Sequence, residues 1–174
     1  MRRIILPFFL GIIVLTFQTT LLASLPIQRI RPDMILILTL YLSFSCPPIF
    51  GGILALFMGY LVDLFSGNSF GLYTFSRPLI FYAAKLFKDR FYLEGARAQI
   101  LFVFIFSLGE GLLILILLTI LNPGPIPNLF PLLFTFLLPQ SLVSGFVAPI
   151  LFLLFDKGSL LVLGHPRIGT EERE

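Results

Sequence analysis

Long apolar runs separated by short polar breaks are the feature that most limits how this chain can fold. The sequence is 57% hydrophobic over 174 residues, and only 12% of it is charged, which is about half the charge of an ordinary soluble domain. Several runs approach or exceed the roughly 20 residues that a helix needs to cross a bilayer. We therefore expect an all-α polytopic membrane protein, with residues 1–174 forming one integral membrane domain.

Six of these runs are candidate membrane-spanning helices. The second run is short for a full span, and Pro47 and Pro48 separate it from the third. These two runs could form one helix kinked at the prolines or two helices in a tight hairpin. A short polar tail, 156–174, is expected after the last run. The six runs are 4–25, 34–45, 49–65, 70–87, 99–121 and 129–155.

The positive charges favour two helices over one kinked helix. Cytoplasmic loops of membrane proteins are enriched in Lys and Arg, and the most basic loop here spans residues 85–97. Two helices place this loop on the same side as Arg2 and Arg3, which precede the first run. One kinked helix would place the loop on the opposite side. We therefore predict six spans with both termini in the cytoplasm.

One polar break, from Gly59 to Gly71, interrupts the apolar pattern most sharply. Asp63 lies where the third run is about to end, and Ser66 and Gly67 begin a series of residues typical of a tight turn. A carboxylate at the end of a membrane helix is costly unless it is solvated, paired or bonded to backbone N–H groups. Asp63 is therefore interpreted either as a local cap of the turn or as a group with a further role.

Two opposite charges lie inside neighbouring runs. Arg77 is about seven residues into the fourth run, and Glu110 is about twelve residues into the fifth, so a rise of 1.5 Å per residue places them at a similar depth. We expect an Arg77–Glu110 ion pair, with Asp63 as the competing partner of Arg77. Such a pair either fixes the register of the helices or lines a cavity.

Small residues recur every four positions in the third run, at Gly51, Ala55 and Gly59. This spacing places them on one face of a helix, and small residues let helix backbones approach closely in lipid. The face is interpreted as a packing surface inside the bundle. The alternative is a docking surface for another membrane protein.

Little in the sequence indicates catalysis, metal binding or nucleic-acid binding. The one cysteine, Cys46, lies in an apolar setting, and the one histidine, His165, lies in the tail, so neither a disulfide nor a metal site is expected. The pI of about 9.3 comes from basic residues spread between membrane segments, without a dense patch. We expect no enzyme activity, no metal, no cofactor and no nucleic-acid partner.

Two short motifs resemble those of the rod shape-determining protein MreD family. Arg31, Pro32 and Asp33 open the second run in the way of the family's R-P-[DN] motif. The segment from Asp63 to Gly71, with Ser66 and Gly67 in between, is similar to its D-L-x-S-G-x-x-x-G turn. The motif region covers about a quarter of the chain, and the rest agrees in length and hydropathy.

The resemblance implies a non-catalytic scaffold of the cell-elongation machinery in the bacterial inner membrane. The expected direct partner is MreC. MreB, RodA and a class B penicillin-binding transpeptidase are expected to join through the complex, which positions peptidoglycan synthesis and maintains rod shape. The family's fold is similar to that of the substrate-binding S-components of energy-coupling-factor transporters. The alternative function is therefore a vitamin-binding component of such a transporter, with a ligand contacting Arg77, Glu110 and the first loop. Fold-level analogy alone is a weak warrant for that function.

Overall fold

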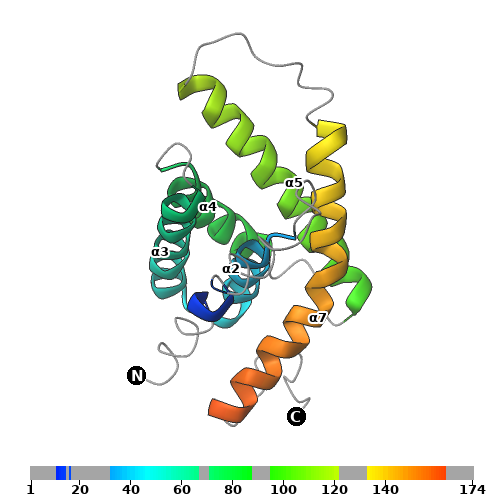
Figure 1. Cartoon of the computed structure of the whole chain (residues 1–174). Helices are drawn as coiled ribbons and strands as arrows, with labels where there is room; N and C mark the ends of the chain where they lie inside the picture. Colours follow the sequence, from blue (N-terminus) through cyan, green and yellow to red (C-terminus); the bar gives the residue numbers. More distant parts are fainter. Residues whose placement is uncertain are drawn as a thin grey trace.

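The computed structural model describes residues 11–14, 16, 32–66, 71–87, 95–121 and 133–163, with only the backbone described for residues 133 and 159–163. In these ranges the regular structure is entirely helical, and Figure 1 shows the arrangement of the helices. The long elements are α2 (Met34–Ser45), α3 (Pro48–Ser66), α4 (Leu72–Phe87), α5 (Ala96–Leu121) and α7 (Leu138–Leu163), the last preceded by the π-helical turn η1 (Leu133–Leu137).

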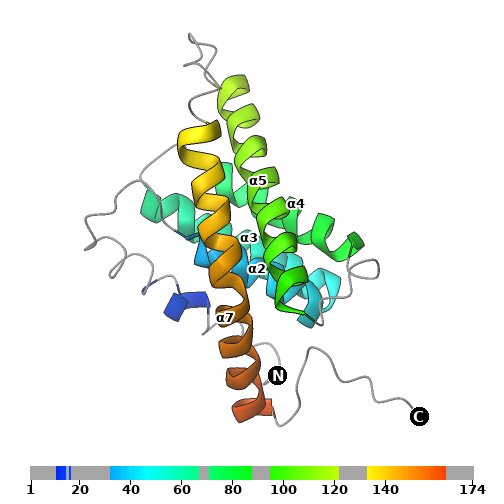
Figure 2. The same ribbon diagram turned by 90° about the vertical axis from the view of Figure 1, so that its right-hand side faces the viewer.

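The short helix α2 forms the centre of the molecule. Every residue from Ile35 to Ser43 is buried, as expected for a helix that is apolar on all sides. It contacts α3 and α4 on one side and α5 and α7 on the other. Figure 1 shows α2 between these two pairs, and Figure 2 shows α5 and α7 lying side by side in front of it. The core of the protein is therefore built around a helix with almost no lipid-facing surface.

Three of the described helices are long and apolar enough to cross a membrane. They are α3, α5 and the segment Phe134–Gly158. At 12 residues, α2 reaches only about 18 Å, which is short of the hydrocarbon core of a bilayer. The first predicted span, 4–25, lies almost entirely outside the described residues, so the full count of six spans stays a prediction.

The segment around Pro47 divides two helices and does not kink one. The helix α2 ends at Ser45, and Cys46 has an extended backbone with φ −113° and ψ 150°. The helix α3 then begins at Pro48, where a missing N–H costs nothing because the first turn has no partner for it. The structure thus has the two helices that the charge distribution favoured.

Contacts along α2 show how the neighbouring helices are oriented. At its start, the backbone N–H of Asp33 donates to Ser144 in the first part of α7. Near its end, the Tyr41 hydroxyl donates to Asp156 further along α7. These two contacts make α7 parallel to α2.

The helix α4 is also parallel to α2, because Arg77 contacts Asp33 while Lys85 reaches the carbonyl of Ser43. Ring contact between Phe44 and Phe102 places the start of α5 at the end of α2, so α5 runs the opposite way. Gly51 lies against Phe81 and Gly59 against Tyr73, so α3 is antiparallel to α4. Successive helices therefore alternate in direction, as they do in membrane hairpins.

The end of α7 differs from the prediction. The sixth run was expected to end at Phe155, whereas the helix continues to Leu163; the cytoplasmic tail, 156–174, stays a prediction. Asp156 lies inside the helix and accepts a hydrogen bond of 2.8 Å from Tyr41. The apolar residues that follow Lys157 and Gly158 give the chain no reason to leave the helix at this point.

The small residues of α3 face α4. A Cβ built on Gly51 would lie 2.2 Å from the ring of Phe81, and one on Gly59 would lie 2.3 Å from the backbone oxygen of Tyr73. Ala55, between them, is completely buried. This face of α3 is covered by α4, so the structure gives no support to the alternative of a free docking surface.

We predict that Gly59→Ala destabilises the protein. The new methyl group meets backbone atoms that cannot rotate away, and overpacking of this kind costs about 1–3 kcal/mol, more than the gain in helix propensity of about 1 kcal/mol. Thermal unfolding in detergent measures the effect. The matched control is Gly109→Ala, where a Cβ meets nothing within 4 Å. Equal melting temperatures for the two variants would contradict the close α3–α4 contact.

Candidate functional site

A buried arginine joins three helices through two ion pairs. Arg77 of α4 is 1% exposed; its Nη2 lies 2.6 Å from Asp33 Oδ2, and its Nη1 lies 3.0 Å from Glu110 Oε2 of α5. The structure thus brings together Arg77 and Glu110, which we expected as a pair. It adds Asp33 as a second partner, in place of the expected competitor Asp63. Isolated charges of this kind are expensive in a membrane interior, and mutual pairing offsets that cost.

Asp33 is held at the start of α2 by the helix itself. One of its carboxylate oxygens accepts the N–H of Leu36 at 2.9 Å, as an N-cap residue does. The other oxygen accepts from Arg77. Its backbone N–H donates to Ser144 of α7 at 3.1 Å. One residue therefore links α2, α4 and α7.

Glu110 receives one further contact from α4. The hydroxyl of Ser76 donates to its Oε1 at 3.0 Å, and Glu110 itself is 3% exposed. The guanidinium of Arg77 also lies 5.5 Å from the centre of the Tyr73 ring, within the range of a cation–π contact. The ion cluster, defined as Arg77, Asp33 and Glu110, holds one cation and two carboxylates.

Asp63 does not join the ion cluster. Its carboxylate accepts hydrogen bonds from the N–H groups of Gly71, Tyr73 and Thr74 at 3.1, 3.0 and 2.8 Å, and from the Thr74 hydroxyl at 2.6 Å. These donors are the free N–H groups at the start of α4, which an anion satisfies and whose dipole it offsets. Gly71 has φ +100°, which favours glycine at this position. The geometry of Asp63 is that of a local cap.

The remaining motif residues lie around these contacts or outside the described ranges. Pro32 immediately precedes Asp33, and Ser66 is the exposed last residue of α3. Arg31 and Gly67 fall outside the described residues.

Sequence reasoning missed the role of Lys85. We expected Lys85 at the end of the fourth run, 70–87, and at the start of the basic loop, 85–97. It lies in the last turn of α4, and its ammonium donates to the carbonyl oxygens of Ser43 and Cys46, a contact that was not expected. These carbonyls end α2, where a cation is favourable to the helix dipole. Its position in the last turn of an apolar helix was the one available signal.

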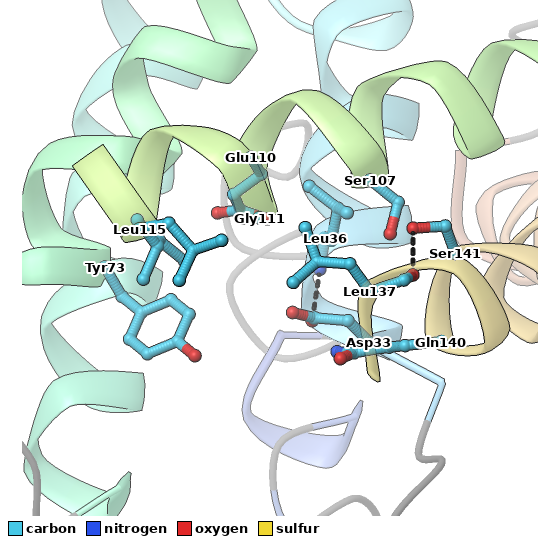
Figure 3. Close-up of a pocket in the computed structure, with 11 residues that line it drawn as sticks. Asp33, Leu36, Tyr73, Ser107, Glu110, Gly111, Leu115, Leu137, Gln140 and Ser141 are labelled. Carbon is cyan, nitrogen blue, oxygen red and sulfur yellow. Dashed lines mark hydrogen bonds between the residues drawn. The ribbon is translucent and has the colours of Figure 1, made fainter. Parts of the chain in front are cut away.

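A pocket of about 140 Å³ lies beside the ion cluster, between α2, α4, α5 and the start of α7. Figure 3 shows Tyr73 facing Asp33 and Gln140 across this space. Arg77 is absent from the lining, so the pocket meets the two carboxylates and not the guanidinium. The polar lining residues are Asp33, Tyr73, Ser107, Glu110, Gln140 and Ser141; the others are Leu36, Gly111, Ile114, Leu115 and Leu137.

Within the described ranges, no group of three His, Cys, Asp or Glu side chains is arranged to hold a metal ion. Three helices long and apolar enough to cross a membrane, packed with a buried ion cluster, are typical of a helical membrane protein. A family model described as rod shape-determining protein MreD matches residues 2–158. The chain therefore belongs to the MreD family, which confirms the resemblance read from the two motifs, and membership indicates a role in determining rod shape. Neither a curated protein nor a solved structure matches the chain.

We predict that Arg77→Ala lowers the free energy of unfolding by about 3–5 kcal/mol, because it leaves Asp33 and Glu110 buried without their shared cation. Adding Glu110→Ala should restore part of the loss, since one of the two stranded carboxylates is removed. Thermal unfolding of the wild-type protein, the two single variants and the double variant in detergent gives a double-mutant cycle. If the losses of the single variants simply add in the double variant, the two residues are not coupled.

We predict that Asp63→Ala destabilises the start of α4 by about 1–3 kcal/mol, because buried N–H groups lose their acceptor. Asp63→Asn should cost less, since its amide oxygen still accepts. Thr74→Val is the matched control, because it removes a single hydroxyl donor to the same carboxylate. Melting temperatures of the three variants test the order. A loss for Asp63→Ala no larger than that for Thr74→Val would argue against the capping role.

Proposed function

We propose that the protein is a non-catalytic scaffold of the bacterial cell-elongation machinery. The observation that carries this proposal is the match of the MreD family model to residues 2–158. In this role the protein binds MreC directly in the inner membrane. It helps to position peptidoglycan synthesis, with MreB, RodA and a class B penicillin-binding transpeptidase joining through the complex.

The internal contacts of the buried charged groups support a scaffold role. Arg77 and Asp33 link α2, α4, α5 and α7 through the contacts described above. Lys85 holds the other end of α2. A framework with its charges committed to internal contacts presents the same surface to a partner at all times, as a scaffold requires.

We further propose that the chain is one integral membrane domain with six spans and both termini in the cytoplasm. Support comes from the alternating directions of α2, α3, α4, α5 and α7 and from the three helices of sufficient length. An S-component-like arrangement of the six helices is part of the same proposal.

The pocket is the observation that favours the alternative function, a solute-binding component of a transporter. It is lined by Glu110, as that hypothesis requires. Arg77, the other expected ligand contact, points to the carboxylates and lies behind the pocket wall. The alternative is therefore kept as an outcome of the experiment below.

We predict that tagged protein purified from native membranes in mild detergent brings along MreC and the wall-synthesis enzymes, as identified by mass spectrometry. A different polytopic protein with the same tag controls for carry-over. An ATPase pair with a coupling subunit in place of MreC would overturn the scaffold in favour of the transporter.

Direct binding is tested by photo-crosslinking from the exposed faces. Ile53 of α3, Ile105 of α5 and Ile150 of α7 are 61%, 48% and 61% exposed and lie on three different helices. A photoreactive residue at each site in turn should give an MreC adduct mainly from one helix. Equal, weak adducts from all three would indicate random collision and contradict a specific interface.

A further inference from the structure

Two carboxylates that line the pocket, those of Asp33 and Glu110, share one guanidinium, that of Arg77. Three carboxylates, those of Asp33, Asp63 and Glu110, lie at this end of the bundle with one guanidinium, Arg77. The N-termini of α2 and α4 each contribute about half a positive charge. Asp33 and Asp63 cap these two ends. Glu110 has only a share of Arg77, so the pocket that it lines is suited to a second cation.

Unpaired hydrogen-bonding groups in the pocket are the second, independent observation. Ser107 is 8% exposed and lines the pocket. Its hydroxyl has no hydrogen bond to any part of the chain that the structure describes, and the same holds for the Tyr73 hydroxyl and the Gln140 amide. Ser107 is buried, and buried polar groups of proteins are almost always hydrogen-bonded. Tyr73 and Gln140 are half-buried at the edge of the pocket. These groups are therefore free to bind a molecule in the pocket (Figure 3).

The shape of the pocket restricts the kind of molecule. Its volume of about 140 Å³ accommodates a small organic group. Its remaining walls include Ile114, Leu115 and Leu137, which are half-buried side chains of α5 and η1. A polar, anionic interior beside apolar walls fits an amphiphile whose small cationic end enters the pocket.

We propose that this pocket binds a primary ammonium group. An ammonium carries one positive charge and three N–H donors. The pocket supplies the carboxylate of Glu110 or Asp33 together with the oxygens of Ser107, Tyr73 and Gln140 as acceptors. The same chemistry comes from two sources, an aminophospholipid head group or a free small amine. The inference goes beyond the scaffold role and does not depend on it.

The test uses the full-length protein in detergent and native mass spectrometry of retained lipid. Phosphatidylethanolamine and phosphatidylcholine with identical acyl chains are the matched probes, because the trimethylated head group keeps the charge but has no N–H donor. The wild-type protein should retain phosphatidylethanolamine about tenfold better, the equivalent of one charge-assisted hydrogen bond. The Ser107→Val variant, which replaces a hydroxyl of the pocket wall with two methyl groups, should reduce this preference to about one.

Further variants keep the result interpretable. If Ser107→Val fails to fold, Gln140→Leu takes its place, since this side chain has no contact with Arg77. Tyr73→Phe should also weaken the preference, whereas Tyr60→Phe, on the exposed side of α3 at 48% exposure, should leave it unchanged.

A second experiment with a free amine distinguishes a lipid head group from a small amine as the bound molecule. Ethylammonium chloride should raise the melting temperature of the wild-type protein, but not of Ser107→Val, relative to equal sodium chloride. A shift with ethylammonium but no preference between the lipids supports a small amine as the occupant. No lipid preference and no shift overturns the proposal, and a lipid preference that persists in the pocket variants overturns it too. Neither failure affects co-purification with MreC, so this proposal and the scaffold role fail separately.

Discussion

The sharing of Arg77 between Asp33 and Glu110 is the interaction on which the rest of the structure depends. A guanidinium that is 1% exposed cannot be left alone in a low-dielectric interior, and two carboxylates at 2.6 and 3.0 Å offset its charge. Each partner comes from a different helix. The ion pairs therefore tie the position of α2 to the positions of α4 and α5.

Apolar contacts then fill the space that the charges define. The residues of α3 that approach α4 are small, and a side chain of any size on Gly51 or Gly59 would collide with α4. Lipid provides little hydrophobic force between helices, so close backbone approach carries much of the association. The two features have different roles. The ion cluster sets the register of the helices, and the glycines allow the backbones of α3 and α4 to approach closely.

The parts that follow from local pattern could be predicted from the sequence. The border between α2 and α3 follows from Pro47 and Pro48, and the similar depth of Arg77 and Glu110 follows from the rise of a helix. The contact between Asp33 and Arg77 could not be predicted, because it depends on where α2 lies in three dimensions. The same is true of the pocket, whose walls come from four helices and the π-helical turn. The contact of Lys85 with the end of α2 could not be predicted either, because the two lie about forty residues apart in the chain.

The central position of α2 has a consequence for how the protein is made. This helix is too short to settle across a bilayer by itself, and the groups that hold its two ends, Arg77 and Lys85, both belong to α4. Both residues follow α2 and α3 in the chain, so they are synthesised later. The central helix α2 can therefore form its final contacts only after α4 has been synthesised. Until then the carboxylate of Asp33 lacks Arg77 as its counter-ion. During this interval of biogenesis α2 depends most on the insertion machinery.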